Sequence, residues 1–453
     1  MRRSTRKLID RSFSGLGVMS IVLMAAALLV ILAPIFVRGL GAIFFRGTVE
    51  FRRMQLEQFE RGSRAAVEEE TAAAAAARAP VYRMLAEFEE ELSAMAAEER
   101  RQYAGQLREV RELVTELLGP APGTPAPVLP RDQYGQTRWD RARFKLDLLL
   151  QRTEYDYSDA ARMGREVRVD RARDFAGTRL EPLFDYLRAH AREMLRPRLT
   201  AYLRFLTDAP LDSHFFGGIW PAILGTLYLT LGAMLFALPM GVISAVYLVE
   251  YAGQGRLISL LRTCVSTLAG VPSIVFALFG LAFFIHSLHV TPGKSIIAGS
   301  MTLAALILPT IIRASEEAIR AVPETYKEAA LSLGAGKWRA VITVILPASL
   351  PGILTGTVIS MGRAAGETAP IIFTAAVSVG KAVELFQARF WEALAQPTPA
   401  LPWNIYNLAT EHEAVDEIRH VQFGMVFVLV LLVLLLNAAA IALRARVARR
   451  LRG

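Results

Sequence analysis

An arginine and a glutamate four residues apart stand in the most informative apolar stretch of this chain. Arg363 and Glu367 lie between Gly352 and Ala375, in a run of mostly apolar residues. A helix that begins at Gly352 and rises 1.5 Å per residue places Arg363 about 16 Å along its axis. This depth is near the middle of a bilayer. A charge there costs about 2.5–3.5 kcal/mol on insertion scales, so it indicates a function.

Two kinds of chemistry fit this pair. Residues four apart share one face of a helix, so Arg363 and Glu367 can neutralise each other as a structural ion pair. Alternatively, Arg363 offers a planar set of five N–H donors to an oxyanion that crosses the membrane. Glu367 then orients the guanidinium or competes with the anion for it. Thr368 completes the candidate pathway, and Gly366 and Pro370 are expected to break the helix beside it.

Arg313 is the second candidate for handling an anion. It directly follows the apolar run Leu308–Ile312, where the sequence predicts the cytoplasmic end of a span. Anchoring by the positive-inside rule explains Arg313 equally well. Pro272 is expected to break the helix of another span. The backbone carbonyl that it frees indicates either a packing kink or a position that lines a pathway.

A polar segment between two apolar spans, residues 322–347, predicts a small helical hairpin. Pro323 opens a helix, Gly334 supplies the positive φ that ends it, and a second short helix runs until Pro347 disfavours continuation. Such a compact knob can dock in a groove of a partner, and an ordinary amphipathic connector is the alternative. The residues that define the segment are Glu328, Ala329, Ala330, Gly334, Leu346 and Pro347.

The apolar residues of the chain supply the elements that position these groups. The chain has 453 residues, of which 53% are hydrophobic, with one Cys and a formal charge of +9. A helix needs about 20 residues to cross a hydrocarbon core of about 30 Å. The pattern therefore predicts an all-α, polytopic membrane protein. The candidate spans are residues 16–37, 222–248, 266–288, 295–312, 352–376 and 425–443.

Basic residues at both ends of the chain indicate the orientation. Arg and Lys residues are frequent in the tail 1–15 before the first span, and Arg residues are frequent in the tail 446–453 after the last. Cytoplasmic flanks carry an excess of Lys and Arg, so both termini are predicted to be cytoplasmic, as an even number of spans requires. The hairpin between the fourth and fifth spans then also faces the cytoplasm. The apolar run of span 16–37 is too long for a typical signal peptide, which favours an uncleaved anchor.

A long insertion, residues 38–215, separates the first two spans and is predicted to lie outside the cytoplasm. Residues 50–118 are rich in Ala, Glu, Arg, Leu and Gln, which are good helix formers. Helical periodicity returns from Trp139 to about Leu206. We expect a charged, mostly helical module, which is either plain solvated structure or a docking platform for an extracytoplasmic partner.

Two motifs resemble a known family of transporters. The hairpin resembles the EAA loop of ABC-importer permeases, with Glu328, Gly334 and Pro347 in register. The run Arg363–Pro370 resembles the R-A-x-G-E-T-A-P signature of the A-type permease subunit of bacterial phosphate importers, the PstA family. The similarity covers about residues 215–445. Further motifs that agree are Gly270–Ile274, Leu308–Arg313, Ala321–Pro323 and Leu401–Tyr406.

The resemblance implies a six-helix, type I, MetI-like permease fold in the bacterial cytoplasmic membrane, with a five-helix core over residues 216–445. It also implies ATP-driven phosphate import, in which the hairpin inserts into a cytoplasmic ATPase and transmits its closure. The implied partners are a C-type permease subunit, a dimeric ATPase and an extracytoplasmic phosphate-binding protein. The long insertion departs from common members of the family and is similar to a longer variant in some proteobacteria.

No cofactor, metal or enzymatic activity is expected on this chain. Gly334–Lys337 is followed by Trp338, so the phosphate-loop spacing is absent, and ATP and Mg²⁺ are assigned to the partner ATPase. His286 and His289 lie three residues apart without further ligands nearby, which does not indicate a metal site. No nucleophile–base pair is apparent.

Two other functions stay open from the residues alone. The first keeps the permease and changes the cargo to another oxyanion, such as sulfate or molybdate. The second is a membrane-anchored helical sensor or scaffold whose insertion is the working part. A scaffold needs no charge in the middle of the membrane, so Arg363 and Glu367 argue against it.

Overall fold

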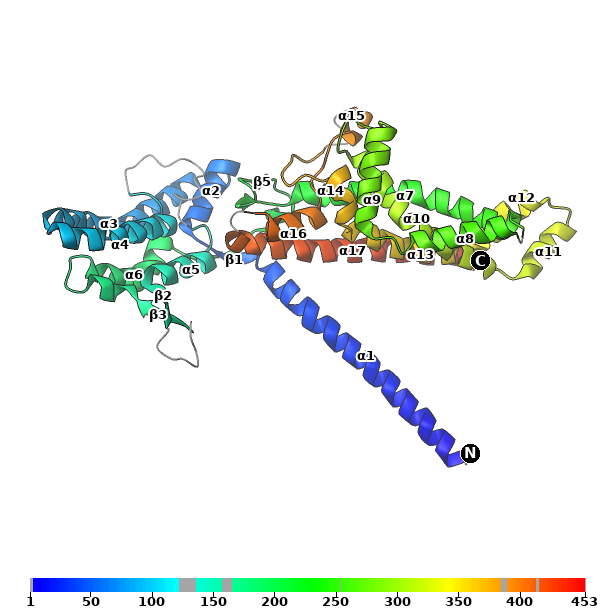
Figure 1. Ribbon diagram of the computed structural model, residues 1–453, viewed down its shortest axis with the longest axis horizontal. Helices are drawn as coiled ribbons and strands as arrows, with labels where there is room; N and C mark the ends of the chain where they lie inside the picture. Colours follow the sequence, from blue (N-terminus) through cyan, green and yellow to red (C-terminus); the bar gives the residue numbers. More distant parts are fainter. Residues whose placement is uncertain are drawn as a thin grey trace. The chain divides into compact units, whose positions relative to one another are not determined.

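The computed structural model describes residues 3–121, 136–156, 165–253, 255–383, 389–412 and 415–452 of the chain. The chain divides into two compact units. The first joins Met1–Ala42 to Leu203–Gly453, and the second consists of Ile43–Tyr202. In Figure 1 the second unit carries the labels α2 to α6.

The second unit is shorter than the insertion predicted over residues 38–215. The flanking residues belong to the first unit, because they pack on its last long helix. A Cβ atom added to Gly424 of that helix would lie 2.6 Å from the Ala42 Cβ and 2.8 Å from the Phe205 ring. Such contacts join residues far apart in the sequence, so a hydropathy pattern does not reveal them.

Five helices among the described residues are long and apolar enough to cross a membrane. A bent pair, Arg256–Leu268 with Ser273–Ser287, makes a sixth candidate if its two parts, which meet at 102°, count as one span. Each predicted span therefore coincides with one of these helices or with the bent pair, although several differ in length or shape from the prediction. The five long helices are Ser12–Leu40, Trp220–Tyr251, Ile296–Arg320, Lys337–Gly366 and Val415–Arg449.

The span predicted over residues 266–288 is divided at Pro272, where the sequence indicates a helix break. α8 (Arg256–Leu268) ends four residues before Pro272, and α9 (Ser273–Gly280) begins directly after it. Proline has no N–H for an intrahelical bond and disfavours helical dihedrals in the residue before it, so the chain turns sharply here. α9 continues into a π-helical turn, Leu281–Ser287.

The fourth span, which at its strict boundaries is short enough to extend a few residues either way, is longer than the predicted residues 295–312. α10 (Ile296–Arg320) continues eight residues further, so Arg313 lies inside the helix and not at its end. Charged residues end a window of high hydropathy, but they do not end a helix, because Arg and Glu are good helix formers.

The fifth span begins and ends earlier than the predicted residues 352–376. α12 (Lys337–Ala340) and a π-helical turn (Val341–Ile345) lead without a break into α13 (Leu346–Gly366). Pro347 falls in the first turn of α13. The missing N–H of a proline is harmless there, so the expectation that Pro347 stops the helix is wrong.

Helices α7 (Trp220–Val246), α10 and α13 form the main packed core of the first unit, and α17 (Val415–Arg452) contributes to it. Small residues allow their backbones to approach closely. A Cβ on Gly241 of α7 would lie 2.5 Å from the Ile311 Cγ2 of α10. This close packing fixes the level at which residues of neighbouring helices face one another.

The remaining elements of the first unit are mostly short. α1 is the exception, because it is long. Both α1 and α17 continue through the basic residues that the sequence predicts as separate tails. These elements are α1 (Arg3–Leu40), β5 (Pro210–Leu211), β6 (Phe216–Gly217), α11 (Glu324–Ser332), α14 (Ala369–Thr374), α15 (Phe390–Leu394) and α16 (Leu401–Thr410).

The second unit is mostly helical, with two antiparallel two-stranded sheets that the sequence pattern does not predict. Phe44 pairs with Ala201 in the β1–β4 sheet, and Gln151 pairs with Asp170 in the β2–β3 sheet. The elements are β1 (Phe44–Gly47), α2 (Val49–Phe59), α3 (Arg64–Ala94), α4 (Ala97–Leu118), α5 (Trp139–Leu150), β2 (Gln151–Asp156), β3 (Arg165–Asp170), α6 (Glu181–Leu195) and β4 (Arg198–Ala201).

This unit has a hydrophobic core of its own. Phe88, Phe175 and Phe184 are fully buried. The Phe175 ring lies 5.7 Å, centre to centre, from each of the other two rings. Aromatic pairs at such distances contribute beyond the area that they bury.

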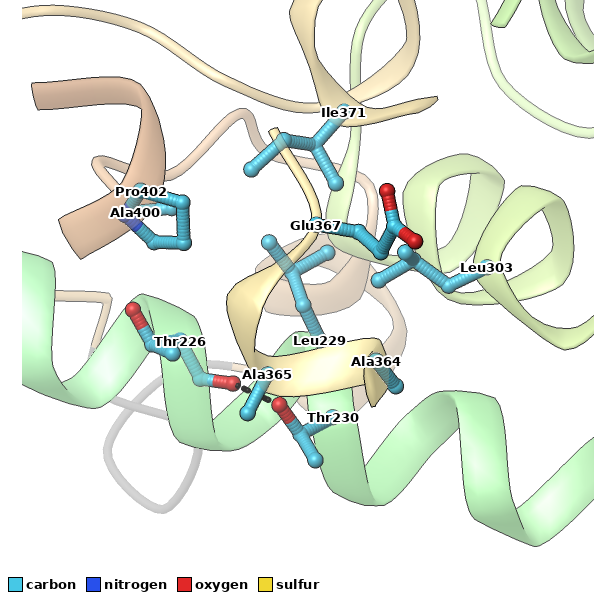
Figure 2. A pocket seen from close by; sticks show the side chains of 10 residues that line it. All are labelled: Thr226, Leu229, Thr230, Leu303, Ala364, Ala365, Glu367, Ile371, Ala400 and Pro402. Carbon is cyan, nitrogen blue, oxygen red and sulfur yellow. Dashed lines mark hydrogen bonds between the residues drawn. The ribbon is translucent and has the colours of Figure 1, made fainter. Parts of the chain in front are cut away.

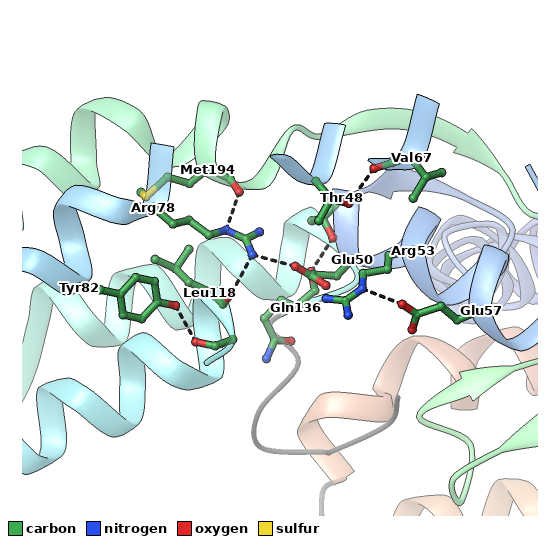
Figure 3. Close-up of polar contacts among 12 residues, drawn as sticks. Thr48, Glu50, Arg53, Glu57, Val67, Arg78, Tyr82, Leu118, Gln136 and Met194 are labelled. Carbon is green, nitrogen blue, oxygen red and sulfur yellow. Dashed lines mark hydrogen bonds and ion pairs between the residues drawn. The ribbon is translucent and has the colours of Figure 1, made fainter. Parts of the chain in front are cut away.

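A buried arginine ties four helices of this unit together (Figure 3). Arg78 of α3 donates from Nη1 to the Glu50 carboxylate of α2 and to the Leu118 carbonyl that ends α4, both at 2.8 Å. Its Nε donates to the Met194 carbonyl of α6 at 2.9 Å. Breaking a buried ion pair from one side costs about 3–5 kcal/mol, so Arg78 is central to the stability of the unit.

Candidate functional site

Arg363 and Glu367 stand on either side of the end of α13. Arg363 lies in the last turn, Gly366 is the last helical residue, and Glu367 follows in an extended conformation with φ −79° and ψ 125°. The Arg363 Nε lies 3.2 Å from the Glu367 Oε1. An arginine in the last turn also interacts favourably with the helix dipole. The pair therefore closes the end of the helix.

This contact engages only part of the guanidinium. The Arg363 and Glu367 side chains are 38% and 22% exposed. Among the described residues, Glu367 alone accepts a hydrogen bond from Arg363, through Nε. Four of the five N–H donors of the group remain for another acceptor. An oxyanion can therefore compete with Glu367 for the guanidinium.

The interruption after α13 follows from local residues. Gly366 weakens the helix, and Pro370 lies in the first turn of α14, a position that suits proline. Thr368 precedes α14 and makes no side-chain capping bond to it. A broken helix at membrane depth is tolerated only where it is buried in protein or lines a water-filled cavity. The break is therefore either buried in protein or beside a cavity.

A small pocket lies between this break and α7 (Figure 2). Glu367 lines one side, Thr226 and Thr230 line the α7 side, and Pro402 of α16 contributes another wall. The cavity volume is about 10 Å³, which is near the minimum for a single water molecule. An oxyanion does not fit, so binding one here requires the walls to move apart.

Thr226 and Thr230, which the sequence marks as residues suited to close helix packing, also line the pocket. The Thr226 Oγ1 donates to the Ala222 carbonyl at 2.8 Å and accepts from the Leu401 N–H at 2.9 Å. The Thr230 Oγ1 donates to the Thr226 carbonyl at 2.7 Å (Figure 2). Thr226 thereby fixes the start of α16 against α7. The sequence signal for this pair is its spacing, because two hydroxyl residues four positions apart lie on one face of an apolar helix.

Arg313 is not brought next to Arg363. A Cβ on Gly356 of α13 would lie 2.2 Å from the Ala314 Cβ of α10, so Arg313 lies at about the level of Gly356. Arg363 is seven residues further along α13, which corresponds to about 10 Å. The two arginines therefore do not form one binding site in this structure, and Arg313 is exposed along α10.

The hairpin forms from α11, a glycine turn and α12. α11 begins after Pro323, and Gly334 has φ +81°. The Ala335 N–H donates to the Ala330 carbonyl at 3.1 Å across this turn. A side chain at this φ is strained, which explains why the helix ends at a glycine.

The tip of the hairpin is apolar and exposed. No residue of α11 is buried. The exposed fractions of Leu333, Trp338 and Tyr326 are 90%, 65% and 52%, and Glu328 and Ala329 are also exposed. Large apolar side chains that gather on a protruding segment mark an interaction surface. This exposure favours the docking knob over a plain connector.

Within the described residues, no three His, Cys, Asp or Glu side chains come together in a way that holds a metal ion. His286 and His289 are both exposed. The expected absence of bound cofactors stays a prediction.

Residues 237–453, which include the hairpin and the Arg363–Glu367 pair, match the family described as binding-protein-dependent transport system inner membrane component. The phosphate transport system permease protein PstA 1 of Mycobacterium tuberculosis strain H37Rv is 36% identical over 242 residues, which cover 53% of this chain and 74% of that protein. The probable ABC transporter permease protein YqgI of Bacillus subtilis is 34% identical over 228 residues, which cover 49% and 76%.

PstA of Yersinia pestis is 35% identical over 225 residues, which cover 49% of this chain and 71% of that protein. An inward-facing structure of the MetNI methionine ABC transporter overlays with a TM-score of 0.37 and 20% identity, over 51% of this chain and 94% of that chain, and carries no weight in the assignment. On the strength of its sequence relatives, the chain belongs to the PstA family of ABC-transporter permeases.

Proposed function

We propose that this chain is a membrane-spanning subunit of an ATP-driven importer of inorganic phosphate. The names of its relatives support the cargo. The observation that carries the proposal is the Arg363–Glu367 pair at a helix break. A guanidinium with four unengaged N–H groups can bind two oxygens of an oxyanion through parallel hydrogen bonds.

In this mechanism, Arg363 exchanges partners during transport. Phosphate entering from outside the cytoplasm draws the guanidinium away from Glu367, while the walls at Thr230 and Glu367 separate. When the pathway opens to the cytoplasm, Glu367 pairs with Arg363 again and displaces the anion. The exchange replaces one negatively charged hydrogen-bond acceptor of Arg363 with another.

The energy comes from partners of this chain. The exposed hairpin of residues 322–347 docks in a cytoplasmic, dimeric ATPase that binds ATP and Mg²⁺. A C-type permease subunit completes the pathway, and an extracytoplasmic binding protein delivers phosphate. Basic residues at both ends of the chain support cytoplasmic termini.

Uptake of radiolabelled phosphate by phosphate-starved cells tests the role of Arg363. Arg363→Ala is expected to lower uptake about 10- to 100-fold, because a hydrogen bond to a charged group contributes about 1.5–3 kcal/mol. Arg363→Lys keeps the charge but loses the planar donor set, so we expect an intermediate rate. Membrane abundance is measured by immunoblot for every variant.

Arg389→Ala serves as the matched control, because this arginine is 87% exposed and pairs with Glu392 three residues away. Sulfate uptake is measured in parallel. Unchanged phosphate uptake with altered sulfate uptake would keep the permease and reject phosphate as the cargo. Unchanged uptake of both anions would reject the role of Arg363.

A further inference from the structure

Two lysines of the hairpin contact adjacent residues at the end of α7. The Lys327 Nζ donates to the Glu250 Oε2 at 2.5 Å, and the Lys337 Nζ lies 4.9 Å from the centre of the Tyr251 ring. Lys327 belongs to α11 and Lys337 begins α12, so each helix of the hairpin contributes one contact. Glu250 and Tyr251 lie in the π-helical turn Tyr247–Tyr251 that ends α7.

The Lys327–Glu250 pair is short, and its carboxylate is buried. The Glu250 side chain is 7% exposed and that of Lys327 is 35% exposed. The nearby pair of Arg320 with Glu316 is longer, at 3.8 Å, and its arginine is 53% exposed. A carboxylate as buried as Glu250 needs its partner, because an unpaired buried charge is costly. The pair therefore holds the hairpin to α7.

Apolar packing supports the same contact. Val341 and Ile345 lie in the π-helical turn between α12 and α13, and both are buried. They form one cluster with Ala245 of α7 and Ile319 of α10. The base of the hairpin is therefore packed, while its tip at Leu333 is exposed.

Two helices thus connect the hairpin to the pocket beside Glu367. α13 continues directly from the hairpin to Ala364. The π-helical turn that contains Glu250 continues α7, which leads back to Thr230. Ala364, Glu367 and Thr230 all line the pocket (Figure 2). Thr230 and Glu250 are twenty residues apart, which corresponds to about 30 Å along a helix. A displacement of the hairpin reaches both walls most directly when both connections hold.

We infer that Glu250 and Lys327 are positioning residues that couple the hairpin to α7, so that both walls of the pocket move together. The inference rests on the proposed function, because it takes the displacement to come from a cytoplasmic ATPase. Without the pair, the displacement reaches the pocket chiefly through α13, and the α7 wall lags. ATP hydrolysis then continues while fewer phosphate ions cross for each ATP.

The test uses the whole importer complex in proteoliposomes, with phosphate uptake and ATP hydrolysis measured on the same preparation. Glu250→Gln and Lys327→Gln are each expected to lower the phosphate-to-ATP ratio at least fivefold. The double variant is expected to lower the ratio no further than the worse single variant, because both changes remove one interaction. Arg320→Gln, which alters the longer and more exposed pair, is expected to keep the wild-type ratio.

Each outcome decides between the alternatives. A wild-type ratio in Lys327→Gln overturns the inference, and so does a double variant whose loss is the product of the two single losses. If Glu250→Gln does not assemble, Lys327→Gln decides, because its side chain lies on the exposed hairpin. A wild-type complex that moves no phosphate contradicts the proposed function, whereas normal transport with an unchanged ratio in Lys327→Gln contradicts this inference only.

Discussion

Two arginine–glutamate pairs of this chain differ in how far their side chains are exposed. In the second unit, the Arg78 and Glu50 side chains are 10% and 5% exposed, and Arg78 also donates to two carbonyls. In the first unit, Arg363 and Glu367 are 38% and 22% exposed, with four guanidinium N–H groups unengaged. The Arg78–Glu50 pair is suited to stability and the Arg363–Glu367 pair to the exchange of partners, although both have the same chemistry.

His214 gives a prediction about acid sensitivity. It lies in the turn between β5 and β6 and is 4% exposed, and burial together with the nearby His412 lowers its pKa to about 4. The unfolded value is about 6.5, so the folded protein resists protonation. The stability that the buried, neutral His214 contributes is fully present above about pH 6.5 and is lost as the pH falls towards 4. We expect the melting temperature of the purified protein to fall over this range.

His214→Asn is expected to reduce that decline, because it removes the titrating group and asparagine tolerates the positive φ of 75° at this position. His289→Asn is the matched control, since His289 also has a positive φ, of 48°, but is exposed. An equal pH dependence in wild type and His214→Asn would contradict the assignment.

At the scale of elements, glycine and proline determine where the helices end, but their effect depends on position. Pro272 separates α8 from α9, whereas Pro347 is accommodated in the first turn of α13. Gly366 ends α13, whereas Gly356 lies within it and permits close contact with α10. The same residue type thus interrupts one helix and packs another.

The turn of the hairpin gives a prediction with an internal control. Gly334→Val places a β-branched residue at φ +81°, which is strained. A left-handed conformation costs a non-glycine residue about 1–2 kcal/mol. We expect the variant to distort the hairpin and to lower phosphate uptake, while membrane abundance stays near wild type. Uptake and immunoblot of the same cells provide the measurement.

Gly336→Val is the control for this experiment. Gly336 lies two residues further along the hairpin at φ −69° and ψ 157°, a conformation open to any residue, and a Cβ there would meet nothing within 4 Å. Wild-type uptake in Gly334→Val, or an equal loss in both variants, would show that the glycine conformation does not govern docking.

At the scale of the whole molecule, two units with separate cores share one chain. The second unit buries its own aromatic core and carries its own polar network around Arg78. The first unit holds the apolar helices, the hairpin and the pocket. Because all residues named for transport lie in the first unit, the second unit is not required to form the pocket.

Residues 43–202 expressed alone are therefore expected to fold and to unfold cooperatively in denaturant, as followed by circular dichroism. Arg78→Met should lower the free energy of unfolding by about 3–5 kcal/mol, because it leaves Glu50 buried without its partner. Arg111→Met is the control, since its ion pair with Glu89 is 65% and 41% exposed and contributes at most about 1 kcal/mol. Equal losses in both variants would refute the special role of Arg78.

Local patterns were sufficient to locate the apolar segments, the hairpin and the charged pair. Hydropathy, the positive φ of glycine and the missing N–H of proline are properties of short stretches, so they can be read without a fold. Local patterns placed the end of the fourth span too early, at Ile312, and wrongly predicted that a helix stops at Pro347. A charge or a proline that ends an apolar window does not have to end a helix.

The contacts between helices required the tertiary structure. It places Thr226 and Thr230 on the pocket wall opposite Glu367, and it separates Arg313 from Arg363. It also pairs Lys327 with Glu250, 77 positions away. These relations depend on the level and rotation at which α7, α10 and α13 pack. Small side chains far apart in the sequence set that packing through close contacts, which no local pattern encodes.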